Sequence, residues 1–590
     1  MAVSWKDHEL YGTLPPLRRT AFAILLILCV YALLAFFGVP QHWTYLANKE
    51  HHEAGHVEAE HHEGQDDPAM EPAEPIAPTE ETEEVSLPPL YMVVPFALLL
   101  LAIAFLPLIP ATEHWWHSNL NKFYVAGTLA IVTLLYYGFF STFTIEGHWP
   151  AHFEVTTDAN PLTKISTVFG NAIIYEFIPF IVLLFALYVI AGGIRIEGNF
   201  KATPIVNSMI LAVGAVLASF IGTTGAAMLL IRLLLDVNRR RKYKVHLVVF
   251  FIFVVCNNGG CLTPLGDPPL FLGYLRGVDF FWTLYLLPYW FAINFILILL
   301  YFLWDTLWYY RKESAEDKER ETAGKTNFKI TGLKVNLPLL FGVILSVAFL
   351  SPTNPVPVIG QFLFPGNDGH PWYFLREAIQ LGLAALSLLL SSHWIRKANA
   401  FSFTAIMEVG VLFFGIFICM QAPLQILSHQ GKHVVAFAQE KTGLNQPHHK
   451  PLMLFWTTGV LSCWLDNAPT YVVFFEVSKS LQPRTEAELR ADPDNWQHDG
   501  KYWRSTERNP HGELKLIPVT GGFINHAHLI AIALGTVFMG GMTYIANGPN
   551  FMVKAIAEQS KVKMPSFFGY MAYSCILLLP LYVVMTIFFL

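Results

Sequence analysis

Apolar blocks of helical length recur along the chain from residue 21 to its last residue. A helix that crosses a bilayer needs about 20 predominantly apolar residues, and about a dozen such blocks can be marked off. Of the 590 residues, 54% are hydrophobic and 14% are charged, whereas soluble domains carry roughly 25% charged residues. The pattern predicts an all-α polytopic membrane protein. It excludes soluble enzymes, nucleic-acid-binding proteins and outer-membrane barrels.

The regular blocks predict spans, and four further apolar stretches are less regular. We expect about 11 full spans plus two re-entrant hairpins. The regular spans cover about 21–39, 89–109, 122–142, 173–192, 280–304, 334–351, 371–393, 404–427 and 567–589. The predicted parts are an extra N-terminal span (1–40), an acidic His-rich loop (41–88), a first repeat (89–304), a linker (305–333), and a second repeat (334–590) with an external insert (481–517).

Basic clusters indicate the orientation. RRRKYK (239–244), RKESAEDKER (311–320) and WIRK (394–397) are expected on the cytoplasmic side by the positive-inside rule. The N-terminus is then cytoplasmic and the C-terminus periplasmic, in a bacterial inner membrane. This holds only if the stretch 204–238 enters and leaves the membrane on one side, which predicts a re-entrant hairpin there. The stretch 451–480 behaves in the same way from the opposite side.

Each predicted repeat places a hairpin before an interrupted helix. The hairpin tips are FIGTTGAAML (220–229) and WLDNAPTYVV (464–473), and the interrupted helices are NNGGCLTPLGDPPLF (257–271) and GGMTYIANGPNF (540–551). Setting Gly259-Gly260 on Gly540-Gly541 also sets Pro268 on Pro549. Paired interruptions at matching places in two inverted repeats point to a transporter binding site.

Oxygen-bearing side chains surround these interruptions. Freed carbonyls and such side chains offer the hard oxygen ligands that Na⁺ prefers. Thr223 and Thr224, at the first tip, either satisfy the tip backbone or offer hydroxyls to an ion. The residues around the two breaks are Asn257, Asn258, Thr263, Asn547 and Asn550.

Two aspartates carry the predicted charge of the site. Asp267 lies in the first break, and Asp466, beside Asn467, lies at the second hairpin tip. A carboxylate at mid-membrane is costly and by default functional. Two such groups close together repel, and either a proton or a small cation relieves that repulsion. The alternative is that each aspartate only caps the helix that follows it.

Two glutamates each open a predicted span. Glu176 starts EFIPF and Glu408 starts EVGVL. An acidic residue at a helix N-terminus interacts favourably with the helix dipole, and this is the favoured interpretation of both.

The order of hairpin and broken helix, repeated inverted, resembles the ion-transporter superfamily. NNGGCLTPLGDPP and WLDNAPT are most similar to its NhaD-type sodium:proton antiporter and citrate-transport branches. The resemblance covers about residues 89–590. It implies a scaffold domain, a mobile transport domain and usually a homodimer, with the substrate bound at the hairpin tips and broken helices. The dicarboxylate symporters of this superfamily carry a Ser-Asn-Thr signature at both tips, and this chain does not.

The segment HHEAGHVEAEHHEG (51–64) is rich in potential metal ligands, although its spacing fits no defined tetrahedral site. A solvated tether is favoured over a metal trap. The candidate metal ligands are His51, His52, His56, His61 and His62.

The sequence therefore predicts a secondary transporter, not an enzyme, that exchanges Na⁺ for H⁺ through Asp466 and Asp267. No nucleotide-binding motif appears, so ion gradients supply the energy, and no cofactor is expected. The partners expected are sodium ions, protons, the lipid bilayer and a second copy of the chain, without nucleic acid. One alternative is a cation-coupled carrier of citrate or a dicarboxylate. Another is a membrane subunit or sensor that does not transport.

Overall fold

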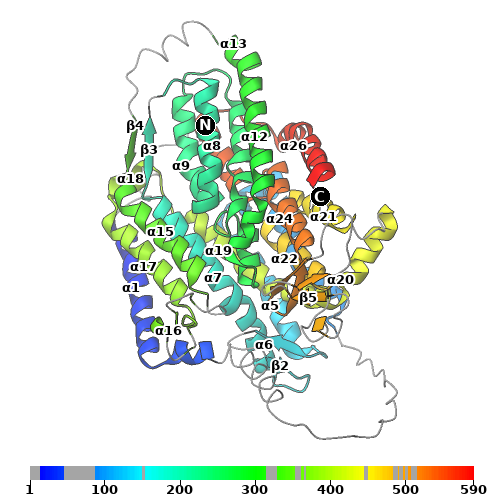
Figure 1. Cartoon of the computed structure of the whole chain (residues 1–590). Helices are drawn as coiled ribbons and strands as arrows, with labels where there is room; N and C mark the ends of the chain where they lie inside the picture. The colour runs from blue at the N-terminus through cyan, green and yellow to red at the C-terminus, as the bar shows by residue number, and fades with distance from the viewer. Residues whose placement is uncertain are drawn as a thin grey trace, which may run out of the picture.

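The computed structural model is helical and confirms an all-α polytopic membrane protein (Figure 1). It describes residues 14–45, 87–148, 153–198, 200–313, 328–351, 356, 360–364, 367, 369–443, 449–482, 489–490, 496–498, 503–505 and 515–589. The predicted histidine metal ligands lie outside these residues. The domain bounds stay predictions.

Within the described part, seven helices are long and apolar enough to cross a membrane, or up to nine if each bent pair is one span. Two shorter apolar helices cover Leu333–Phe349 and His526–Met542. The segment Pro204–Ile221, predicted as one limb of a hairpin, is itself among the seven. The two bent pairs change direction by 102° and 47°, so these predicted spans are not straight helices; they are Leu90–Phe105 with Pro110–Trp116, and Thr404–Cys419 with Gln421–Lys441.

Both predicted hairpins are helical down to their tips. In the first, α8 (Pro204–Ile221) turns at Gly222 into α9 (Thr223–Val237), and the two helices lie side by side in Figure 1. Gly222 has φ +79°, a conformation that is open to glycine at little cost. The second hairpin joins α21 (Lys450–Trp464) to α22 (Asn467–Lys479).

Both predicted broken helices are interrupted at their glycines. The first runs from α10 (Val245–Val254) through a 3₁₀ turn (Asn258–Leu262) to α11 (Pro268–Leu275). The second runs from α24 (His526–Met539) through a 3₁₀ turn (Gly540–Met542) to α25 (Gly548–Gln559). Nearly every residue of α10 and α24 is buried, so these two halves of the broken helices lie at the centre of the molecule.

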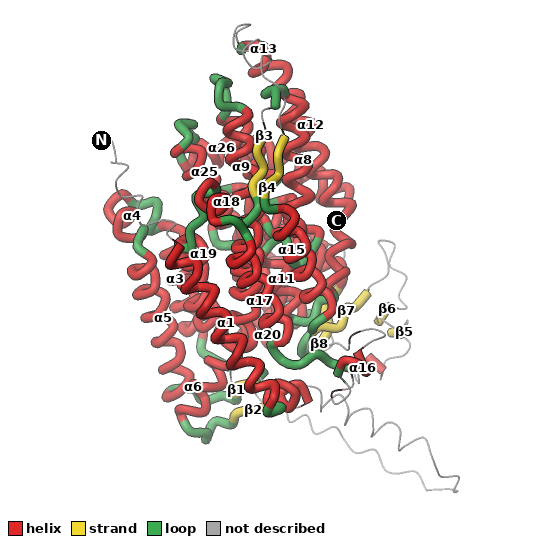
Figure 2. The backbone as a smooth tube through the Cα atoms, turned by 90° about the vertical axis from the view of Figure 1, so that its left-hand side faces the viewer, coloured by secondary structure: helices red, strands yellow, loops and turns green. Residues whose placement is uncertain are grey.

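Other helices surround this centre. α5 packs on α19, α7 on α17, and α1 lies along α17 (Figures 1 and 2). The helices not yet bounded are α1 (Leu14–Phe36), α3 (Val94–Phe105), α4 (Pro110–Trp116), α5 (Asn119–Phe139), α6 (Pro161–Phe169), α7 (Ile178–Ala191), α12 (Leu287–Trp304), α13 (Tyr310–Lys312), α15 (Leu333–Phe349), α16 (Gly360–Leu363), α17 (Leu375–Leu390), α18 (His393–Ala398), α19 (Thr404–Cys419), α20 (Gln421–Thr442) and α26 (Phe567–Phe589); short 3₁₀ turns cover Leu90–Val93 and Phe280–Leu286.

Within the described residues, the strands are short and lie between helices. Antiparallel pairs join β1 (Ile145–Gly147) to β2 (Phe153–Val155) and β3 (Arg195–Gly198) to β4 (Phe328–Thr331). A four-stranded antiparallel sheet follows α22, in the order β5 (Trp496–His498), β6 (Trp503–Ser505), β7 (Lys515–Val519) and β8 (Gly522–Asn525). The predicted insert 481–517 therefore contributes part of a sheet that continues to the start of α24.

The two glutamates lie in different surroundings from those predicted. Glu176 does not open a helix, because it lies in a π-helical stretch, η3 (Gly170–Phe177), that joins α6 to α7 in one continuous helix. Its carboxylate pairs with Arg276 at 2.5 Å. Glu408 lies in the second turn of α19 and pairs with Lys122 at 2.6 Å. Both glutamates are therefore fixed by ion pairs with other elements.

A buried ion pair holds the start of the first broken helix. Arg241 donates two hydrogen bonds to Asp305, at 2.8 and 2.5 Å, and both side chains are at most 1% exposed. His246, in the first turn of α10, lies 3.0 Å from the same carboxylate, and Tyr301 donates to it at 3.0 Å. Arg241, predicted only as part of a basic cluster, is therefore a structural residue.

We expect the Asp305→Asn variant to lose about 3 kcal/mol of stability, because it removes the nearer of the two carboxylates that face the buried Arg241 guanidinium. The matched control is Glu558→Gln, which breaks the more exposed Lys554–Glu558 pair of α25 and should cost less than about 1 kcal/mol. Thermal unfolding of the two purified variants in one detergent checks this. Equal midpoints would contradict it.

Candidate functional site

The hairpin tips and the broken helices meet through backbone hydrogen bonds. The Thr223 N–H donates to the carbonyl of Gly266 at 2.8 Å, joining the first tip to the first break. The Asn467 N–H donates to the carbonyl of Ala546 at 3.2 Å, joining the second tip to the second break. Each tip therefore supplies a partner to a carbonyl freed where the neighbouring helix is interrupted.

A second contact between hairpin and broken helix occurs in both halves, and a threonine of the break makes it each time. The Thr263 hydroxyl donates to the carbonyl of Ser219, four residues before the first tip residue. The Thr543 hydroxyl donates to the carbonyl of Cys463 at 2.7 Å, four residues before Asn467. Thr543 carried no prediction, although a match to Thr263 in the correct register identifies it.

These contacts fix the register between the halves. They match Gly260 with Gly540 and Pro269 with Pro549, one residue away from the register in which both glycine pairs coincide. In the register set by the contacts, Asp267 and Asn547 occupy equivalent positions, each directly before the half-helix that follows the break. The two breaks therefore differ by one charge.

Three neutral donors converge on Asp267, which is 1% exposed. Asn467 donates to its carboxylate at 2.7 Å, Thr223 at 3.1 Å and Asn547 at 3.2 Å. The three come from the second tip, the first tip and the second break. The structure thus brings together residues that the sequence places in four separate segments, around one carboxylate.

An amide network continues from this carboxylate. Asn547 also donates to the side-chain oxygen of Asn257 at 3.2 Å, and Asn257 donates to that of Asn550 at 2.8 Å. Asn550 in turn donates to the carbonyls of Gly540 and Thr543, at 2.8 and 2.9 Å. The predicted asparagines of the two breaks are therefore connected, and they satisfy backbone groups inside the second break.

Asp466 lies one residue before Asn467 and is half-buried. It is the N-cap of α22, where its carboxylate accepts a hydrogen bond from the Ala468 N–H at 3.1 Å. The capping alternative therefore describes its contact in this structure. The hydrogen bonds of the site converge on Asp267.

The remaining predicted residues lie at the edge of the site around Asp267. Thr224 is half-buried in the first turn of α9 and makes none of the hydrogen bonds to Asp267. Asn258 points toward α26, where Tyr582 donates to its side chain at 3.4 Å. Thr263 braces the first hairpin rather than contacting the carboxylate. Among the residues with a described position, no group of three or more His, Cys, Asp or Glu could hold a metal ion.

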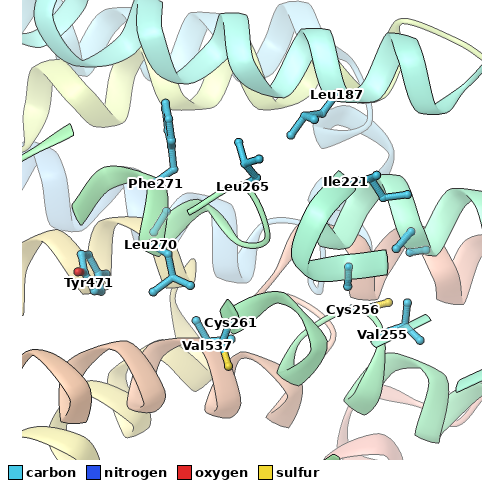
Figure 3. Close-up of a cluster of buried hydrophobic side chains, with 14 of the residues drawn as sticks. Leu187, Ile221, Val255, Cys256, Cys261, Leu265, Leu270, Phe271, Tyr471 and Val537 are labelled. Carbon is cyan, nitrogen blue, oxygen red and sulfur yellow. The ribbon is translucent and has the colours of Figure 1, made fainter. Parts of the chain in front are cut away.

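Four helix N-termini start at these tips and breaks: those of α9, α11, α22 and α25. The N-terminus of a helix carries about half a positive charge and favours an anion. Apolar side chains that neighbour these polar residues in the sequence are buried and gather in one region (Figure 3); they are Ile221, Cys256, Cys261, Leu265 and Leu270. In such low-dielectric surroundings, helix termini and amide donors can offset the cost of a buried carboxylate.

Comparison with known proteins identifies the family of this chain. A model of the family described as "Putative citrate transport" matches residues 85–590, a range that contains both hairpins and both broken helices. A search of curated proteins finds no match. The helix α1 precedes the matched range, as does the predicted acidic loop (41–88) apart from its last four residues. With this match over most of its length, and with membrane-spanning apolar helices around paired broken helices, the chain belongs to the "Putative citrate transport" family of transporters.

Proposed function

We propose that this transporter exchanges Na⁺ for H⁺ at Asp267, in a bacterial inner membrane, as a homodimer with a cytoplasmic N-terminus and a periplasmic C-terminus. The supporting observation is a buried carboxylate whose hydrogen-bond donors are all neutral. Within the described residues, no Lys or Arg side chain hydrogen-bonds with it. Its counter-charge is therefore free to be exchanged, which is the property an antiport site requires.

The donors suggest how the exchange proceeds. The side chains of Asn467 and Asn547 present N–H groups to Asp267, and a rotation of each amide presents its oxygen instead. In the proton-bound state the neutral carboxyl needs fewer donors. In the Na⁺-bound state the amide oxygens and the Thr223 hydroxyl join the carboxylate as hard ligands. Because either cation neutralises the same group, the two compete.

Asp466 has a supporting role in this proposal. Its half-buried carboxylate, next to Asn467, attracts the incoming cation to the second tip. Its cap on α22 requires only a side-chain oxygen, so the charge is left for the ion.

A cation-coupled citrate carrier is the second candidate. The family description favours it, and so do the four helix N-termini, which can bind a carboxylate of a substrate. Asp267 would repel that substrate unless a bound cation neutralised it first.

We expect Asp267→Asn to abolish sodium-dependent dissipation of a pH gradient in liposomes that hold a pH-sensitive dye, with a loss of at least about 100-fold, because it removes the exchangeable charge. Asp466→Asn should also lose exchange, because it removes the charge that attracts the cation to the second tip. The matched control is Asp279→Asn, since Asp279 also caps a helix, by accepting from the Phe281 N–H at 2.9 Å. It should transport normally. Full exchange by Asp267→Asn would remove this carboxylate from the mechanism. Full exchange by Asp466→Asn would leave Asp466 a cap only.

We also expect Na⁺ to stabilise the protein. A ligand at 100 times its Kd adds about 2.7 kcal/mol, so NaCl should raise the unfolding temperature above that in choline chloride. The rise should be absent in Asp267→Asn. No response of the wild type to Na⁺, together with uptake of labelled citrate into liposomes, would favour the citrate carrier instead.

A further inference from the structure

A cavity of about 430 Å³ lies at the far end of the half-helix that Asp267 starts. It is bounded by η3, α20, α22 and the turn between β7 and β8. Arg276, the residue that ends α11, lines it. One eight-residue helix therefore has Asp267 at its start and the cavity at its end.

Two carboxylates on different elements approach the Arg276 guanidinium. Glu176, on η3, is 2.5 Å away, and Glu476, on α22, is 3.8 Å away. All three side chains are at most 10% exposed. Arg276 is thus paired with η3, while a second partner on the hairpin lies just beyond hydrogen-bond distance.

Neither glutamate forms a complete and exclusive pair with Arg276. Within the described residues, Glu176 Oε2 is buried without a direct hydrogen-bond partner, although a carboxylate oxygen next to a guanidinium normally takes part in a bidentate pair. The side chain of Gln421, on α20, also interacts with this carboxylate. Glu476 is held by Lys479 at 2.8 Å. The Arg276–Glu176 contact is therefore not the best pair that these groups can form, and Lys479 competes with Arg276 for Glu476.

The connection to the transport site is covalent and short. Arg276 follows the last turn of α11, and its carbonyl accepts from the Thr520 N–H at 2.9 Å. Asp267 directly precedes the first turn. A helix of two turns transmits a displacement of one end to the other, because its backbone hydrogen bonds keep it rigid.

We propose that Arg276 is a positioning residue that sets the place of Asp267 by pairing alternately with Glu176 and Glu476. When it pairs with Glu176, the end of α11 is fastened to η3. When it pairs with Glu476, α11 is released from η3 and remains packed on α22, whose first residue is Asn467, a hydrogen-bond donor to Asp267. The two pairings are discrete, and the cavity gives the guanidinium room to change partner. The inference depends on the proposed function only in taking Asp267 as the transport site.

Hydrogen exchange of the amides of residues 270–276, in the full-length protein in lipid nanodiscs, tests this. Glu176→Gln should raise the exchange rate roughly tenfold, since α11 loses its attachment to η3. Lys479→Gln should also raise it, because Glu476 becomes free to take Arg276. Glu476→Gln should leave it unchanged or lower it, since Arg276 then has Glu176 alone. Ion transport should slow in Glu476→Gln, because α11 cannot be released.

A purely structural ion-pair cluster gives a different pattern. Each lost carboxylate would raise exchange, and Lys479→Gln would leave α11 unaffected. That pattern overturns the proposal, as does normal transport in both Glu176→Gln and Glu476→Gln. Opposite effects of the two glutamate variants without sodium exchange in the wild type would retain Arg276 in this role and reject sodium antiport. Sodium exchange in the wild type, together with effects of the same sign in the two glutamate variants, would retain sodium antiport and reject this role of Arg276.

Discussion

The structure depends on satisfying backbone groups where two central helices are interrupted. A peptide group without a partner is costly in apolar surroundings, and the breaks between α10 and α11 and between α24 and α25 expose several. The hairpin tips supply partners through Thr223 and Asn467, and Thr263 and Thr543 return the contact to the hairpins. Hairpin and break therefore require each other. Gly222, at φ +79°, allows the first tip to turn directly into α9 next to this contact.

The two equivalent breaks differ by one charge. The equivalent positions before the two half-helices hold Asp267 and Asn547, and the amide of Asn547 donates to the carboxylate of Asp267 at 3.2 Å. Two aspartates there would repel each other across the site, and two asparagines would leave it without charge. With one aspartate and one asparagine, the second break supplies a hydrogen-bond donor to the carboxylate of the first. The single charge can then be neutralised by one proton or one monovalent cation.

Local patterns predicted the parts of the fold that local chemistry determines. Glycine, proline and asparagine mark the breaks and tips, because they are favoured where a helix must stop, and most of the predicted site residues do lie there. The register was wrong by one residue, since a glycine pair can match in two ways and only the contacts of Thr263 and Thr543 decide between them. The pattern places Glu176 at the start of a span because the π-helical stretch that contains it has no sequence signal of its own.

Long-range ion pairs could not be predicted for a related reason. Arg241 and Asp305, or Arg276 and Glu176, are far apart in the chain, and charge alone does not select a partner. A basic cluster indicates topology without showing that Arg241, one member of RRRKYK, is buried against a carboxylate.

The first broken helix is consequently fastened at two ends by different kinds of contact. At the start of α10, His246 lies against an aspartate that already holds Arg241 and Tyr301, and its ring stacks on Tyr309 at 4.0 Å. This end is held by several bonds to one carboxylate, and Glu313 offers Arg241 a second carboxylate at 3.7 Å. At the end of α11, Arg276 has one close carboxylate and a second nearby. Any rearrangement of the break is therefore expected to move α11 and not α10. Asp267, which directly precedes α11, would then move relative to Asn257, which follows α10.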